Sequence, residues 1–393
     1  MPRPFFSMPS ATRILIGGLL VSQAVFGQGG AVPTNTAPPG GEGVASVALG
    51  VALPGGPGSM EVNPALLAWE GERSLSVVQY SASESELLPN IPNPPFAVDR
   101  VRSLGFRYPV KPGTDVALGY SWHELDWGRV PGWDKFGDPD GSWITSTEAV
   151  HHVVLAGRLG GIASVGLGWR WIDSRFAEGL KDSLGKPIGT GTASTWNLGL
   201  RLAPTWRVPA TPLRITPSLG MSWISVGEDS ISYGTGVQDP IERVRRWGAA
   251  LTATVPDLVT GEFFLDEETN LSWADRRKSF GYEGWSFEAL GIVRWSSADL
   301  IDPEGDRFET QTSTQYIVDA KRLWRFYKRV STGRLLSPDP VEMEGFPLPT
   351  WTVAGIALTP NVRFTWTESE IDSKATGWIS RTGQQRLGWA LSL

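Results

Sequence analysis

The most regular feature of this chain is the alternation of apolar and polar residues within short runs. In residues 164–171, one set of alternate positions is apolar and the other is small or polar. The apolar set is Val165, Leu167, Trp169 and Trp171, and the other set is Gly166, Gly168 and Arg170. Because successive side chains of a strand point to opposite faces, this run predicts a β-strand with one apolar face.

About fourteen such runs follow one another, each near the roughly 10 residues that a tilted strand needs to cross a bilayer. They lie at 74–83, 101–109, 114–125, 147–159, 162–174, 193–206, 212–227, 242–256, 260–273, 282–298, 308–319, 350–358, 361–371 and 384–393. Some are joined by tight turns, such as 160–161 and 359–361, and others by long polar links, as in membrane barrels. The pattern predicts an all-β fold, a transmembrane antiparallel β-barrel of about fourteen strands over residues 71–393.

Tryptophan supports a membrane location for the apolar faces. The chain has 19 Trp among 393 residues, and many stand near the ends of the alternating runs. A soluble sandwich would bury its apolar faces, whereas a membrane barrel turns them to lipid and rings them with aromatic residues where water begins. The predicted lipid-facing girdle comprises Trp122, Trp169, Trp171, Trp223 and Trp389.

The opposite faces of the runs predict the lining of the lumen. The lumen-facing candidates are His123, Arg170, Asn197, Arg201, Arg363 and Arg386. His151 and His152 are adjacent, so at most one of them faces inward. The same faces carry glycines at 119, 166, 168, 199 and 388, which leave space for something wide. Either a segment of this chain or a ligand would fill that space.

The first residues predict export. Arg3 and Arg13 precede an apolar core at 14–26, and small residues allow cleavage before Gln28, so 1–27 is the expected signal peptide. This apolar run is shorter than the roughly 20 residues of a membrane-spanning helix. Residues 28–42 are predicted to be a flexible tail. The expected location is the outer membrane of a Gram-negative-type bacterium, with outer-membrane lipid as a partner.

Composition and motifs give little support to catalysis. The chain has no Cys, three His, and no Gly-x-Ser-x-Gly elbow, so thiol chemistry and a serine hydrolase site are not expected. The segments 138–141 and 302–306 contain turn-forming Asp-Pro and Pro-Asp pairs but lack a complete calcium-loop pattern. A net charge of -6 does not favour nucleic acid. We expect no enzyme activity, no metal and no cofactor.

The segment before the first strand carries a motif, Asn63-Pro64-Ala65, followed by Leu66-Leu67-Ala68. After a small-residue run and a short turn, this motif resembles the N-terminal segment of the FadL-like outer-membrane barrels. That superfamily includes the fatty-acid transporters and the PorV/PorQ proteins of type IX secretion. Val62 stands where an aromatic residue is usual, and Leu66 where Gly is usual. The resemblance implies a fourteen-stranded barrel in which residues 43–70 form a lumenal hatch.

Two functions of different classes follow from this resemblance. The first is passage or binding of hydrophobic small molecules, with Asn63, Pro64 and Ala65 setting the position of the hatch. The alternative is a PorV/PorQ-like component of a type IX secretion system, which acts through secretion-system proteins and has long rigid outer loops such as 127–146. A purely structural barrel is a third reading.

One segment departs from the alternation. Residues 319–334 combine six Lys or Arg residues with apolar residues at helical spacing. The spacing predicts a basic amphipathic helix. It would be an interfacial helix on acidic head groups, an element that faces a partner, or a solvated helix within a long connection.

Overall fold

The fold was analysed in a computed structural model of the 393-residue chain. It describes residues 50–54, 57–69, 75–81, 85–86, 96–133, 139–178, 189–228, 230–233, 238–255, 259–271, 276–287, 292–301, 304–334, 351–353, 356–358, 363–373, 378–384 and 389–392. The predicted signal peptide and tail lie outside the described residues, as do the first part of the predicted hatch and the turn at 359–361.

The described part of the chain forms one large antiparallel sheet and a separate small hairpin. The long strands are β1 (Leu75–Ser81), β3 (Phe96–Lys111), β4 (Thr114–Trp133), β5 (Pro139–Leu159), β6 (Ala163–Glu178), β7 (Thr190–Leu202), β9 (Arg214–Gly227), β12 (Val244–Val255), β13 (Val259–Asn270), β14 (Arg276–Phe287), β15 (Ile292–Ile301), β16 (Arg307–Asp319), β19 (Arg363–Ser373), β20 (Trp378–Gln384) and β21 (Trp389–Ser392). Shorter strands of the sheet are β2 (Ser85–Glu86), β8 (Trp206–Arg207), β10 (Ser230–Tyr233) and β11 (Gln238–Pro240), and the hairpin consists of β17 (Trp351–Val353) and β18 (Ile356–Leu358).

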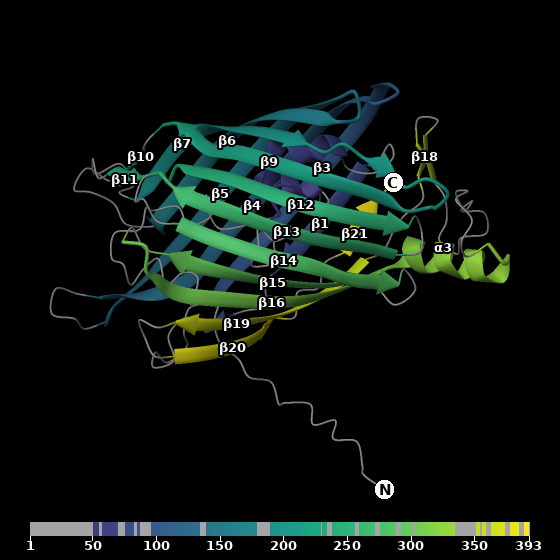
Figure 1. The fold of residues 1–393 in the computed structure, drawn as a ribbon. Helices are drawn as coiled ribbons and strands as arrows, with labels where there is room; N and C mark the ends of the chain where they lie inside the picture. The colour runs from purple at the N-terminus through teal and green to yellow at the C-terminus, as the bar shows by residue number, and fades with distance from the viewer. Residues whose placement is uncertain are drawn as a thin grey trace, which may run out of the picture.

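The long strands pair in chain order. From β1 through β3, β4, β5, β6, β7, β9, β12, β13, β14, β15 and β16 to β19 and β20, each long strand is antiparallel to the next. The last strand, β21, pairs with the first, β1. Figure 1 shows how this meander curves around the residues that precede β1, which are drawn in purple. The sheet therefore has a concave inner face and a convex outer face.

The two faces differ in chemistry, as the alternation predicts. Along β7, exposed and buried side chains alternate almost without interruption. Leu155, Leu167 and Leu198 lie opposite one another on β5, β6 and β7, and all three are exposed on the outer face. Further exposed apolar residues of this outer face include Phe106, Leu118, Val165, Leu200, Leu219, Leu251 and Phe263. Exposed apolar surface of this extent is unusual in a soluble monomer.

Some of the predicted boundaries were wrong. The run predicted at 282–298 is two strands, because β14 ends at Phe287 and β15 begins at Ile292. The run predicted at 350–358 forms the separate β17–β18 hairpin and does not join the large sheet. The expected outer loop 127–146 consists largely of the paired ends of β4 and β5. Alternation alone does not show where one strand ends if the next strand continues the same alternating pattern. It also does not show how far two paired strands extend beyond the expected membrane-spanning length.

Connections at the two ends of the sheet differ in length. At one end, β3 and β4 are joined by residues 112–113, and β5 and β6 by 160–162. At the other end, the link between β9 and β12 is long enough to include β10 and β11, which Figure 1 shows far from α3. The helix α3 (Ala320–Ser331) follows β16 at the short-turn end, so the helical prediction for 319–334 is confirmed. No helix among the described residues is long and apolar enough to cross a membrane.

The inner face holds the segment that precedes β1. Residues 50–54 and 57–69, here called the N-terminal segment, include two short 3₁₀-helices, η1 (Pro57–Glu61) and η2 (Pro64–Trp69). The second helix contacts β5, β6 and β7, and almost every described residue of the segment is buried. Apolar side chains on one side pack against the inner face of the large sheet, here called the wall. Met60 and Leu67 form one cluster with Ala117 and Val154. The segment is thus part of the core on the inner side of the sheet.

Candidate functional site: the contacts between the N-terminal segment and the wall

Asn63 is the central polar residue of the N-terminal segment. Its side-chain amide donates hydrogen bonds to the carbonyl of Val51 (2.9 Å) and to the carbonyl of Leu200 on β7 (3.0 Å). Its Oδ1 accepts the backbone N–H of Ala65 (3.1 Å), which caps the start of η2 where Pro64 fixes the turn. Asn63 is fully buried. It therefore shapes the segment and joins it to the wall with one side chain.

Glycines of the wall make this close approach possible. A Cβ atom at Gly166 would meet the backbone of Pro64 and Ala65, and one at Gly199 would meet Asn63. In the same way a Cβ at Gly119 would collide with Met60 and Leu67. The space that these inward glycines leave is therefore filled by the N-terminal segment.

We expect Gly199→Ala to weaken the attachment of the N-terminal segment. The added methyl group meets Asn63 and the backbone at Ala65, and overpacking of a closely packed interior costs about 1–3 kcal/mol. The measurement is thermal unfolding of the purified protein in detergent. Gly261→Ala is the matched control, because a Cβ there meets nothing within 4 Å. Equal stability of the two variants would contradict the packing described here.

A second polar centre lies at Glu61, at the end of η1. Its carboxylate accepts a hydrogen bond from Ser121 on β4, contacts the imidazole of His152 on β5 and forms an ion pair with Arg170 on β6. The distance from His152 Nδ1 to the carboxylate is 2.8 Å. Burial raises the pKa of the Glu61 carboxyl, but His152 and Arg170 outweigh burial and hold it below its ordinary value. Glu61 is therefore a charged carboxylate in the interior.

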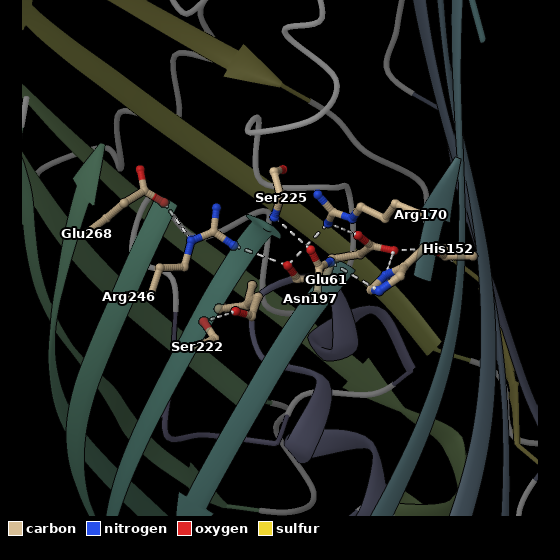
Figure 2. Close-up of polar contacts among 10 residues, drawn as sticks. Glu61, His152, Arg170, Asn197, Ser222, Ser225, Arg246 and Glu268 are labelled. Carbon is tan, nitrogen blue, oxygen red and sulfur yellow. Dashed lines mark hydrogen bonds and ion pairs between the residues drawn. The ribbon is translucent and has the colours of Figure 1, made fainter. Parts of the chain in front are cut away.

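The backbone around Glu61 is also held by the wall. The carbonyl of Glu61 accepts a hydrogen bond from Arg246 on β12 (3.1 Å), whose Nε in turn pairs with Glu268 on β13 (2.6 Å). The hydroxyl of Ser222 on β9 donates to the carbonyl of Val62 (2.7 Å). Figure 2 shows Arg246 and Glu268 on one side of Glu61, and His152 and Arg170 on the other. The segment is thus held through both its side chains and its main chain.

The two ends of the N-terminal segment have anchors of their own. At the start, the carboxylate of Asp266 on β13 accepts the backbone N–H groups of Gly50 (2.8 Å) and Val51 (3.0 Å). At the other end, the indole N–H of Trp69 donates to Ser164 (2.6 Å). The ring of Trp69 also lies 4.2 Å from the guanidinium of Arg201, within range of a cation–π contact. The contacts therefore extend along the whole described length of the segment.

The lumen-facing candidates have different places in the structure. His123, Arg170, Asn197 and Arg201 are buried, and the last three bond to the segment or to residues that contact it. Arg363 is the first residue of β19 and lies opposite Asp319 in the register. Arg386 lies outside the described residues. Of the adjacent histidines, His152 is buried inside and His151 is on the outer face, so only one of them faces inward, in agreement with the expectation.

The girdle candidates lie on the outer face where their side chains are described. Trp169 is exposed, and Trp122, Trp171 and Trp223 are half-buried. The rings of Trp122 and Trp171 stack on opposite sides of His151, at centroid distances of 6.1 and 4.7 Å. Trp389 lies on β21 opposite Gln79. Trp122, Trp169 and Trp171 thus belong to an aromatic row with His151 across β4, β5 and β6, whereas Trp223 on β9 lies opposite Leu198.

Sequence reasoning missed Glu61, Arg246, Asp266 and Glu268 as parts of this site. The inward position of His152 is the signal that could have indicated Glu61, since a buried His beside Arg170 needs an acidic partner. The wall acids and Arg246 occupy ordinary alternate positions of β12 and β13, so their role depends on what docks against them. No group of three or more His, Asp or Glu side chains within the described ranges is placed to hold a metal ion.

An antiparallel sheet with an apolar outer face, polar inner groups and an aromatic row is the arrangement of outer-membrane β-barrels. No protein-family model matches the sequence, and no curated protein matches it either. Several solved structures are similar over most of the chain. They include hydrocarbon channels and a FadL homologue, which are members of the FadL-like outer-membrane barrel superfamily.

The CymD monoaromatic hydrocarbon channel has 12% identity and a TM-score of 0.44, and covers 91% of this chain and 97% of its own. The Pseudomonas putida toluene transporter TodX has 10% identity and a TM-score of 0.41, with 90% and 96% covered. A Pseudomonas aeruginosa FadL homologue has 8% identity and a TM-score of 0.42, with 90% and 96% covered. At these values the similarity assigns no ligand to this chain. The PorV/PorQ alternative and its secretion partners receive no support from these structures.

Proposed function

We propose that this protein is an outer-membrane β-barrel that passes or binds hydrophobic small molecules. The long strands pair antiparallel in chain order from β1 to β20, which supports the proposal of a barrel of about fourteen strands. The pairing of β21 with β1 brings the last strand beside the first. The exposed apolar outer face would contact lipid, and Trp122, Trp169, Trp171, Trp223 and Trp389 would lie at the membrane boundaries.

The observation that carries this proposal is the N-terminal segment on the inner face. It is joined to the wall by polar contacts at Asn63 and Glu61 as well as by the apolar cluster around Met60 and Leu67. The polar contacts bind groups at fixed positions, and we propose that their exchange lets the segment leave as one unit. We propose that residues 43–70 are a hatch, that Asn63, Pro64 and Ala65 set its closed position, and that its movement opens the lumen.

Cross-linking the hatch to the wall tests the proposal. Val62 and Ser222 are neighbours through a hydrogen bond, and the chain has no native Cys, so Val62→Cys/Ser222→Cys places one thiol on each side. We expect liposomes holding the reduced protein to take up labelled fatty acid faster than protein-free liposomes. Oxidation should abolish most of this difference, and reduction should restore it, because a disulfide prevents the hatch from leaving.

The two single-cysteine variants are the controls and should be insensitive to oxidant. Deletion of residues 57–69 should also change uptake, since the lumen then lacks its occupant. If the reduced protein takes up no more than protein-free liposomes, passage of such molecules is contradicted. If uptake is equal in the oxidised and reduced states, a moving hatch is contradicted while passage stands.

A further inference from the structure

The helix α3 has an apolar side and a basic side. Four apolar residues are spaced at i, i+3, i+4 and i+7, as on one face of an α-helix, and they are Leu323, Phe326, Tyr327 and Val330. We call these four residues the apolar stripe. The other side carries the basic residues, which are Lys321, Arg322, Arg325, Lys328 and Arg329. The helix contains no Asp or Glu, so its charge is entirely positive.

The end of α3 is fixed by its own backbone. Gly333 has a left-handed backbone (φ 66°), and its N–H donates to the carbonyl of Val330 (3.2 Å). The N–H of Arg334 donates to the carbonyl of Arg329 (2.9 Å), which completes a Schellman motif. The helix is therefore a defined element of 12 residues, about 18 Å long at 1.5 Å per residue.

The exposed side of α3 is the apolar side. Tyr327 and Val330 are 58% and 54% exposed. Apart from Ser331 at the end, every other residue of the helix is half-buried or buried, and Arg329 on the basic side is fully buried. A helix in water turns its charged side outward and its apolar side to the core. The arrangement in α3 is the reverse, which favours an apolar medium around the stripe.

The helix begins where the apolar outer face of the sheet ends. Tyr316 and Val318, near the end of β16, are each 40% exposed on that face. Val293 of β15, opposite Tyr316 in the register, is exposed there as well. Only Asp319 separates Val318 from the first residue of α3, and Figure 1 shows the helix directly following the sheet. Because no linker intervenes, all of α3 lies within about 18 Å of this apolar surface.

Aromatic and basic side chains border the stripe. Trp324 lies next to Tyr327, with ring centroids 5.4 Å apart, and Trp and Tyr are enriched where a membrane meets water. The Nζ atom of Lys328 lies 5.3 Å from the centre of the Trp324 ring. On the other edge of the stripe, Arg322 is one helical turn from Phe326. Apolar, aromatic and basic residues therefore follow one another around the helix, as in helices that lie at a membrane surface.

We infer that α3 is a docking element for anionic phospholipid, on the membrane surface at the short-turn end of the sheet. The apolar stripe enters the boundary between head groups and acyl chains, and the bordering Lys and Arg side chains reach the phosphates. Five positive charges on one helix, in a chain of net charge -6, make an anionic surface the complementary partner. The inference rests on the membrane location in the proposed function, but not on the passage of any molecule.

A dye on the stripe tests the inference in the whole protein. Because the chain has no native Cys, Val330→Cys places a single exposed thiol on the stripe for labelling with a fluorescent dye. The protein is reconstituted in vesicles of phosphatidylcholine, with or without phosphatidylglycerol, that carry a quencher on the acyl chains. Phosphatidylglycerol should increase lipid quenching at Val330→Cys several-fold. Salt near 1 M, where the Debye length is about 3 Å, should remove much of this increase.

Two further labelling positions are controls. Thr332→Cys is exposed at i+2 from Val330, on the other side of the chain, and should stay accessible to a water-soluble quencher. Leu155→Cys, on the outer face, should be quenched by lipid in every vesicle. Quenching by lipid at Leu155→Cys but not at Val330→Cys would overturn the inference alone, whether the dye at Val330 is in water or covered by protein. Absence of lipid quenching at both positions would overturn the proposed barrel as well.

Charge removal tests the anionic partner. A basic residue near an anionic surface favours binding by a factor of roughly five, so Lys321→Gln/Lys328→Gln should weaken the helix–lipid equilibrium about 25-fold. Arg207→Gln/Arg214→Gln is the matched control, because these two exposed residues lie opposite each other on β8 and β9, outside the helix. The readout is the phosphatidylglycerol content at half-maximal quenching of Val330→Cys. An equal value in both double variants would contradict the docking of α3 on anionic lipid.

Discussion

Replacing Glu61 by methionine is expected to release the N-terminal segment far more often than in the parent protein. The substitution keeps the side-chain volume but leaves Arg170 buried without the carboxylate that it pairs with. Removal of one partner of a buried ion pair costs about 3–5 kcal/mol. Ala65 is fully buried and the chain has no native Cys, so the thiol of an Ala65→Cys variant reacts with a labelling reagent when the segment leaves. Because each 1.4 kcal/mol is a factor of ten, Glu61→Met should accelerate this labelling on the order of 10²–10³-fold.

The double variant Glu61→Met/Arg170→Met separates the charge from the packing. With both charges removed, no buried ion is left uncompensated, and such replacements are often close to neutral. We therefore expect the double variant to label at a rate much nearer to that of the parent than either single variant. Glu304→Met, at an exposed position, is the control for loss of one negative charge. If the double variant labels as fast as Glu61→Met, the ion pair is not what holds the segment.

The sequence predicted the parts of this structure that depend on local pattern. Alternation placed Arg170 and Asn197 on one face and Trp169 on the other, because the two-residue period of a strand fixes the direction of each side chain. The apolar spacing in 319–334 correctly indicated a helix, for which the period is 3.6 residues. The motif Asn63-Pro64-Ala65 predicted a capped turn, since Asn bonds its own backbone and Pro fixes the chain direction.

Contacts between distant segments could not be predicted in this way. Glu61 is 91 residues from His152 and 109 from Arg170, and nothing local in the sequence relates them. Gly166 and Gly199 indicated space on the inner face but not its occupant. The division of 282–298 into β14 and β15 was missed because apolar residues continue through the connection. Which residues meet across a sheet or a lumen depends on the topology of the fold. The hydrophobic pattern of one sequence constrains that topology only weakly.

Placing an arginine on the outer face at Leu167 should strongly destabilise the protein in a bilayer. Leu167 lies between Leu155 and Leu198 of the adjacent strands, and between Ile162 at the short-turn end and Trp169 in the aromatic row. In a membrane barrel this is near the middle of the hydrocarbon. Arg at the midplane of a lipid-facing strand costs about 2–4 kcal/mol, a factor of roughly 30 to 1,000 in the folding equilibrium.

The same substitution should have a much smaller effect on stability if the outer face is in water. An exposed Leu→Arg change on a soluble sheet alters stability by only about 0.5 kcal/mol in either direction. Folding into liposomes, followed by the fluorescence of the 19 Trp residues across a denaturant series, measures the difference. Ile162→Arg is the matched control, because near the interface the cost falls to about 0–1 kcal/mol. A small effect at both positions would contradict a lipid-facing outer surface, and a large effect at Leu167 alone would place the membrane midplane across β5, β6 and β7.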